Sequence, residues 1–266
     1  MRDAGWIRVV AGVLIFALAG LSHAGDADGE GADPKPRDPH AYAEGRDFGP
    51  MRPHFADEAT YASFWAEQFE LQWNDGDRNG AWDVQAWYGY DYDRAVFKSE
   101  GAREGSDFRE VRSELLWSHA LAPFWDMQLG IRHDTGGGPR RNWLAFGVQG
   151  LAPYWFEVEA TAYAGPGGRH AARLDLSYEL LFTQRLILEP QLEMDYYTRS
   201  DPLRHVGQGL SEASVGLRLR YEFRREFAPY VGIEHARRFG ATADLLRQAG
   251  DPVRETAVVA GLRFWF

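Results

Sequence analysis

Acidic side chains recur at even spacings in three consecutive segments of the carboxyl-terminal half of the chain. Glu157 and Glu159 are two residues apart, and Glu193 and Asp195 repeat that spacing. Because successive side chains of an extended strand point to opposite faces, carboxylates at even spacings share one face. A wall of carboxylates attracts cations. We therefore predict a polar path that binds a metal cation weakly, lined by Glu157, Glu159, Asp175, Glu179, Glu189, Glu193 and Asp195.

The same faces also carry positive charges, at Arg173, Arg218, Arg220 and Arg263. Together with Glu222, eight of these twelve charged positions are acidic, and this excess favours cations. Opposite charges on neighbouring strands equally predict a salt-bridge network that stabilises a wet interior. The residues alone leave both interpretations open.

A second group of metal-binding side chains lies near the amino terminus, in HAYAEGRDFGPMRPH. It contains His40, Met51 and His54. Imidazole suits Cu(II), whereas thioether sulfur suits Cu(I), so these residues form a candidate cluster that captures copper loosely. The alternative is a solvated tail in which the histidines have no metal role.

DGDRNG, Asp75 to Gly80, matches the opening of a calcium-binding loop. Such a loop needs a bidentate Glu at its twelfth position, and that position is Ala86. A polar hairpin turn is therefore the favoured interpretation.

Two hydrolytic alternatives rest on histidines. His133 and Asp134 are adjacent, as in a His–Asp pair that activates water, although a second acidic group would also be needed. A phospholipase would need a Ser–His pair facing lipid, and neither His119 nor His235 has an obvious Ser partner. We predict that the chain is not an enzyme.

From about Ala66 to the end of the chain, apolar and polar residues alternate with a period of two, which predicts the strands that position these residues. In LDLSYEL, for example, Leu174, Leu176 and Tyr178 alternate with polar residues, which is typical of a strand with one apolar face. Twelve strands are predicted, over residues 66–74, 81–91, 95–103, 108–120, 124–134, 142–151, 155–164, 169–182, 185–198, 211–224, 227–238 and 255–266.

The connections between these segments alternate in length. LAPFW, LAPYW, FTQR and REFAPY are tight, whereas HDTGGGPRRN, GPGGRHA, SDPLRHVGQGLS and FGATADLLRQAGDPVRET are long and polar. This alternation is typical of a bacterial membrane barrel, with short periplasmic turns and longer outer loops. We therefore predict an all-β fold, a transmembrane antiparallel β-barrel of about twelve strands over residues 66–266. A soluble sandwich that exposes its charged faces is the alternative.

The chain ends on VAGLRFWF, which alternates up to Phe266. We predict that this last strand closes the barrel against the first. A terminal Phe on such a strand resembles the signal that the outer-membrane barrel-assembly machinery reads, which makes that machinery an expected partner together with the lipid of the outer membrane.

The amino terminus is typical of an export signal, because VVAGVLIFALAGL is apolar and is followed by the small residues of SHA. We predict cleavage after Ala24 and a disordered periplasmic tail over residues 25–65, rich in Asp, Gly and Pro, with one or two helical turns over Asp57–Trp65. The 266-residue chain has no cysteine, which excludes disulfides and thiolate metal sites. Its net charge of −10 argues against nucleic-acid binding.

Four long motifs closely resemble the copper resistance protein B family (CopB/PcoB). They are FELQWNDGDRNGAWDVQAWYGYDYDRAVFKSEG, FGVQGLAPYWFEVEATAY, LLFTQRLILEPQLEMDYY and GLSEASVGLRLRYEFRREFAPYVGIE. The resemblance covers nearly all of the predicted barrel. It implies an outer-membrane protein of a bacterial copper resistance system, which exports or sequesters copper together with a periplasmic multicopper oxidase.

One feature departs from that family. Many members carry a long tail rich in Met and His, and here the tail keeps only His40, Met51 and His54. High-capacity copper binding by the tail is therefore in doubt, whereas a transport or scaffolding role of the barrel is unaffected.

Overall fold

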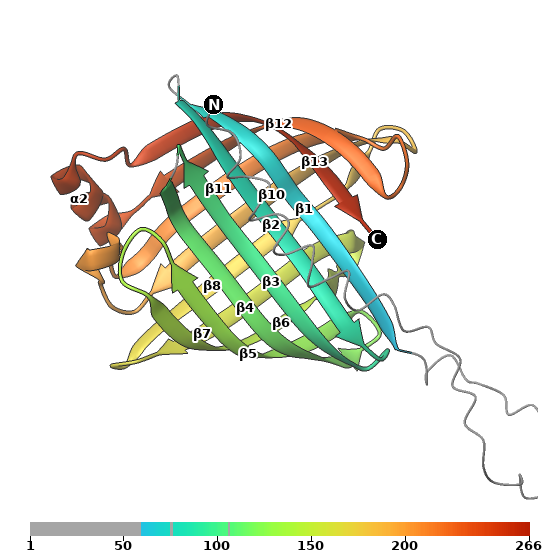
Figure 1. Cartoon of the computed structure of the whole chain (residues 1–266), viewed down its shortest axis with the longest axis horizontal. Helices are drawn as coiled ribbons and strands as arrows, with labels where there is room; N and C mark the ends of the chain where they lie inside the picture. Colours follow the sequence, from blue (N-terminus) through green and yellow to red (C-terminus); the bar gives the residue numbers. More distant parts are fainter. Residues whose placement is uncertain (1–59, 75–76, 106) are drawn as a thin grey trace, which may run out of the picture. The chain divides into compact units, whose positions relative to one another are not determined.

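The computed structural model describes residues 60–74, 77–105 and 107–266, which form an antiparallel sheet that closes on itself (Figure 1). Twelve long strands make the wall, and the two-residue β9 continues the line of β8. The strands are β1 (Tyr61–Asn74), β2 (Asp77–Gly89), β3 (Asp93–Glu104), β4 (Asp107–Ala122), β5 (Trp125–Thr135), β6 (Arg141–Ala152), β7 (Phe156–Gly165), β8 (Arg169–Ser177), β9 (Leu180–Leu181), β10 (Leu186–Tyr197), β11 (Gly209–Tyr221), β12 (Phe227–Arg238) and β13 (Arg254–Trp265).

The first and last strands close the barrel, as the alternating carboxyl terminus predicts. Phe64 and Phe266 exchange two backbone hydrogen bonds, of 2.8 and 3.0 Å, and their rings stack with centroids 5.3 Å apart. Trp65 and Trp265 stack beside them at 5.6 Å. The closed seam leaves no free sheet edge between β1 and β13, so every strand in this part of the wall has two neighbours.

The two faces of each strand have opposite polarity. On β4, Leu115 and Trp117 are exposed on the outer face, whereas Glu114 and Ser118 are buried on the inner face. Other exposed apolar side chains of the outer face include Leu129, Ile131, Leu144, Phe146, Val215, Leu217, Val231, Ile233 and Val258. Buried inner polar groups include Glu70, Arg112, Gln128, Arg132, Glu189, Arg218 and Arg220. The polarity is inverted relative to a water-soluble protein, as in a barrel whose outer face meets lipid.

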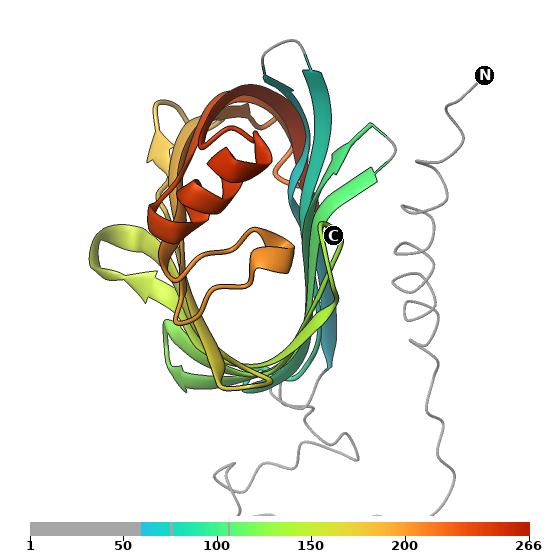
Figure 2. The same ribbon diagram turned by 90° about the vertical axis from the view of Figure 1, so that its left-hand side faces the viewer.

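The two ends of the barrel differ. The short-turn end, defined by residues 90–92, 123–124, 153–155, 178–185 and 222–226, carries the two Leu-Ala-Pro-aromatic turns, and Phe124 of one contacts Trp155 of the other edge-to-face at 6.2 Å. The long-loop end carries η3 (Pro202–Arg204) and α2 (Gly240–Ala249). Figure 2 shows α2 and the connection between β10 and β11 lying across the ring of strands. Gly207 N–H donates to Thr242 Oγ1 at 2.8 Å, which joins this connection to α2.

Three details differ from the sequence predictions. The first strand begins at Tyr61, so Tyr61–Trp65 is extended rather than helical, because these residues pair with β2 and, near Trp65, with β13. The segment predicted as one strand over 169–182 is interrupted after Ser177. The last long connection contains α2, which strand periodicity does not reveal, and Gly250 ends it at φ 84°.

The predicted leader and most of the tail lie outside the described residues, with His40, Met51 and His54. Within the described part of the chain, no helix is sufficiently long and apolar to span a membrane.

Candidate cation path in the barrel lumen

The seven predicted carboxylates lie on one continuous wall. Glu157 and Glu159 are on β7, Asp175 is on β8, Glu179 lies just after β8, and the other three are on β10. Glu159, Asp175 and Glu193 are directly opposite one another in register, so three carboxylates form a row across β7, β8 and β10. Directly opposite residues on one sheet face are close neighbours. The even spacing of these carboxylates in the sequence therefore corresponds to one shared face of the sheet.

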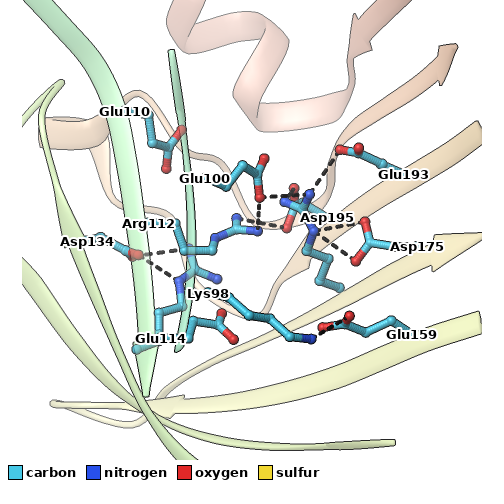
Figure 3. A network of polar contacts seen from close by, with 12 residues as sticks. Lys98, Glu100, Glu110, Arg112, Glu114, Asp134, Glu159, Asp175, Glu193 and Asp195 are labelled. Atoms are coloured by element: carbon cyan, nitrogen blue, oxygen red, sulfur yellow. Dashed lines mark hydrogen bonds and ion pairs between the residues drawn. The ribbon is translucent and has the colours of Figure 1, made fainter. Parts of the chain in front are cut away.

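Arg173 forms ion pairs with several carboxylates of this wall. Its guanidinium lies 2.9 Å from Asp175, 2.9 Å from Glu193 and 3.5 Å from Asp195. Figure 3 shows these three carboxylates near Glu100 and Arg112. Arg173 also reaches Glu100 on β3, at 3.0 Å. Arg112 on β4 joins the group, 3.4 Å from Glu100 and 3.5 Å from Asp195. These contacts cross the lumen, since β3 and β4 are far from β8 and β10 around the ring.

A second cluster of ion pairs and hydrogen bonds lies in the lumen around Arg218. The Arg218 guanidinium on β11 lies 3.0 Å from Glu70 and 2.7 Å from Glu234. It also donates to Gln191 Oε1 at 2.5 Å, and Gln68 Nε2 donates to the same oxygen at 3.2 Å. We call the two clusters together the lumen belt, which consists of Gln68, Glu70, Glu100, Arg112, Arg173, Gln191, Glu193, Asp195, Arg218 and Glu234.

The lumen belt separates two cavities. The cavity toward the long-loop end has a volume of about 450 Å³, and that toward the short-turn end about 370 Å³. Gln68, Glu100, Arg112, Arg173 and Glu193 line both. The short-turn cavity is the more acidic, with nine carboxylate and three cationic side chains in its lining, against eight and five in the other. A cation is therefore attracted more strongly from the short-turn end.

Most carboxylates of the predicted wall are paired. Glu159 accepts from Lys98 Nζ at 2.6 Å, while Glu179 and Glu189 both pair with Arg220. Among the described residues, Glu157 has no cation within 4 Å and accepts a hydrogen bond from Ser177 Oγ at 3.1 Å. Paired carboxylates have less charge to offer a passing ion, so Glu157 is the most available member of the wall.

The described residues hold no group of three or more His, Asp or Glu side chains that could coordinate a metal. What the described part of the lumen offers cations is electrostatic attraction.

The hydrolytic and calcium alternatives gain nothing from the geometry. Asp134 points inward to Arg132 at 2.6 Å and to Trp143 Nε1 at 2.8 Å, whereas His133 is on the outer face beside Asn142. The two therefore do not form a dyad, because adjacent residues of a strand point oppositely. Asp75 and Gly76 lie outside the described residues, and Asp77 pairs with Asn74 at the start of β2, as in a hairpin.

The wall on the far side was missed from the sequence. Glu70 lies between two apolar residues in FELQW, which is the alternation that could have revealed it. The neighbours of Gln68, Glu100 and Arg112 are of mixed polarity, so the local signal for these three residues is weak. What the sequence did not show is that these strands face β8 and β10 across the lumen.

Together, the closed antiparallel wall, the apolar outer face and the charged lumen define an outer-membrane type of β-barrel. The NanC porin has the same fold, with a TM-score of 0.51 over 74% of this chain and 98% of that chain, at 12% identity. The family model of copper resistance protein B precursor (CopB) matches residues 60–266. The chain belongs to this family.

Two relatives agree with that assignment. Copper resistance protein B of Escherichia coli is 41% identical over 82% of this chain and 74% of its own length. The copper resistance protein B homolog of Pseudomonas syringae pv. tomato is 43% identical over 79% of this chain and 71% of its own length.

Proposed function

We propose that this outer-membrane protein handles copper ions through the barrel lumen, in efflux or sequestration, and acts with a periplasmic multicopper oxidase rather than as a catalyst itself. The observation that carries the proposal is the acidic short-turn cavity. In bacterial barrels the short turns face the periplasm, so this cavity opens toward the compartment in which periplasmic copper is met.

The charges that line the cavity favour the passage of a cation rather than its tight binding. The row of Glu159, Asp175 and Glu193 concentrates cations, while Lys98 and Arg173 compensate part of the charge and keep binding weak. A passing ion must be attracted enough to enter and held weakly enough to leave. Glu157, which has no ion-pair partner among the described residues, lies beside the short turn at 153–155 and would meet the ion early.

The tail and the carboxyl terminus have supporting roles in this proposal. His40, Met51 and His54 of the periplasmic tail would deliver copper loosely to the cavity. The terminal Phe266 would be read by the barrel-assembly machinery during insertion.

The experiment measures ion conductance and copper flux across bilayers that hold the purified barrel, with and without residues 25–54. The test variant combines Glu157→Gln, Glu159→Gln and Asp175→Gln. The matched control is Asp244→Asn, an exposed carboxylate on α2. We expect the triple variant to lose most of its copper flux and to lower copper tolerance in cells, with normal assembly. Unchanged flux and tolerance would refute the lumen path.

A second function is favoured by the lumen belt, which fills the middle of the barrel with ion pairs. In this version the barrel stays closed and is a docking scaffold for the oxidase. A barrel that passes no ions yet captures the oxidase in a pull-down would support the scaffold and exclude the conduit.

A further inference from the structure

A carboxylate, an indole, an imidazole and a thioether lie on neighbouring strands of the outer face of the barrel, near its short-turn end. Asp93 is on β3, Trp117 and His119 are on β4, and Met127 is on β5. His119 is directly opposite Asp93 on one side and Met127 on the other. They are 26 and 8 residues from His119 in the chain, so the β3–β4 and β4–β5 registers alone bring them together.

Asp93 determines which nitrogen of His119 is free. Its Oδ1 lies 2.9 Å from His119 Nδ1 and also accepts a hydrogen bond from Trp117 Nε1 at 2.9 Å. A carboxylate on Nδ1 holds the proton there, which leaves the Nε2 lone pair as the ligand atom. This carboxylate–imidazole arrangement is the usual support of a metal-binding histidine.

Met127 and Asp93 flank His119 on opposite sides in the sheet. Asp93 contacts Nδ1 from the β3 side, and Met127 is opposite His119 on β5, the neighbour of β4 on the other side. Side chains directly opposite in an antiparallel pair have Cβ atoms roughly 4.5–5.5 Å apart. The Met127 thioether, on three rotatable bonds, can therefore reach the same ion as Nε2.

The ligand pair selects the metal. Thioether sulfur is a soft ligand that prefers Cu(I), and imidazole also binds copper. The Trp117 ring packs against His119 with centroids 5.5 Å apart and adds a face of negative potential for a cation.

We propose that His119 Nε2 and Met127 Sδ form a Cu(I)-binding site at the short-turn rim, with Asp93 as the residue that positions His119. The site is outside the lumen and separate from the acidic path. The His119 and Asp93 side chains are 38% and 50% exposed, so the rest of the protein does not cover them.

The chain provides matched controls for both ligands. His235 is another outer-face histidine, but its Nδ1 contacts Thr256 Oγ1 at 2.8 Å instead of a carboxylate, and Val215 is its other neighbour in register. Met194 on β10 is opposite Leu174 and Ala213, with no histidine in register. His235→Ala and Met194→Leu therefore remove the same chemistry from places that lack the pairing.

The test is a titration of the purified full-length barrel with Cu(I), under reducing conditions, against a chromophoric Cu(I) chelator. The protein carries His40→Ala, Met51→Leu and His54→Ala, so the tail ligands do not contribute. We expect one tightly bound Cu(I), a loss of affinity of at least about tenfold in His119→Ala and in Met127→Leu, and unchanged affinity in both controls. Asp93→Asn should weaken binding by about tenfold while Nε2 is still present.

X-ray absorption of the bound copper gives a second measurement. A sulfur neighbour is expected in the parent protein and in Met194→Leu, and is expected to be absent in Met127→Leu. Heat-modifiable gel mobility shows that each variant has folded. Equal Cu(I) affinity in the parent, His119→Ala and Met127→Leu would overturn the site, and so would equal losses in the two controls. Copper flux through the lumen is not measured, so this result and the lumen test fail independently.

Discussion

The guanidinium of Arg173 on β8 lies 3.0 Å from the carboxylate of Glu100 on β3. The two strands are almost diametrically opposite in the ring, so the side chains meet across the lumen. This contact ties the two walls of the barrel together at the level where the two cavities meet. Arg173 also pairs with Asp175, Glu193 and Asp195, so one guanidinium contacts four carboxylates, and Arg112 shares two of them, Glu100 and Asp195.

Replacing Arg173 by Gln should open the lumen and make it more cation-selective. The change removes the bridging guanidinium, which leaves Asp175 and Glu193 without their ion-pair partner and leaves Glu100 and Asp195 with Arg112 alone. Conductance in planar bilayers is expected to rise several-fold, and the loss of a buried ion-pair partner should cost about 3–5 kcal/mol of stability.

Arg247→Gln is the control for Arg173, since Arg247 is an exposed residue of α2 paired with Asp244. Its conductance and stability should match the parent. If Arg173→Gln conducts no better than Arg247→Gln, the lumen belt is not the barrier.

Two adjacent residues of β5 should differ strongly in how much their substitution destabilises the barrel. Asp134 is buried between Arg132 and Trp143, so Asp134→Ala leaves a buried guanidinium without its partner. We expect a loss of about 3–5 kcal/mol in the free energy of unfolding. His133 is on the outer face, and His133→Ala should change stability by less than about 0.5 kcal/mol.

Urea unfolding of the refolded barrel in detergent measures both. A peptide-hydrolysis assay on the same samples tests the protease alternative, and activity abolished by His133→Ala would revive it. Equal destabilisation by the two substitutions would contradict the assignment of the faces.

The connection between β10 and β11 should stay in place in mild acid. Asp201 accepts from Arg141 Nε at 2.8 Å and lies 3.9 Å from Arg169. Burial acts to raise the pKa of Asp201, but the hydrogen bond and charge of Arg141, with Arg169 and Arg204, hold that pKa below its usual range. The stabilisation from a depressed carboxyl pKa is complete above the unfolded value of about 3.9 and is lost as the pH falls through the lower folded value.

Hydrogen–deuterium exchange of residues 198–208, corrected for the intrinsic pH dependence, measures this. Protection should be constant from about pH 7 to about pH 5 and should fall below about pH 4. Asp201→Asn should be unprotected throughout. Loss of protection near about pH 6 in the parent would instead indicate a histidine.

The carboxyl-terminal residue should matter for closure. Deletion of Phe266 removes the two backbone hydrogen bonds to Phe64 and the stacked ring pair, the latter worth about 0.5–1.5 kcal/mol beyond its buried area. We expect slower refolding and a smaller fraction of the heat-modifiable folded form on gels. Phe182→Ala, at an exposed turn, is the matched aromatic control. Normal closure without Phe266 would show that the rest of β13 suffices.

The sequence by itself determined the class of the fold and one wall of the lumen. Because the side chains of a strand alternate with period two, WFEVEATA and LDLSYEL already show that Glu157, Glu159 and Asp175 point inward if their apolar neighbours point outward. The alternating lengths of the connections predicted a barrel, and the alternation up to Phe266 predicted that the last strand closes it. These are local properties, which depend only on residues near one another in the chain.

The tertiary structure decided which charges meet. Whether Asp175 is free to attract an ion or is neutralised depends on Arg173, and whether Arg173 is shared depends on Glu100, which reaches it across the lumen. Strand register placed Met127 opposite His119. Periodicity says which face a side chain occupies, but only register and the closure of the ring say which side chains lie opposite it, because both depend on pairings between distant strands.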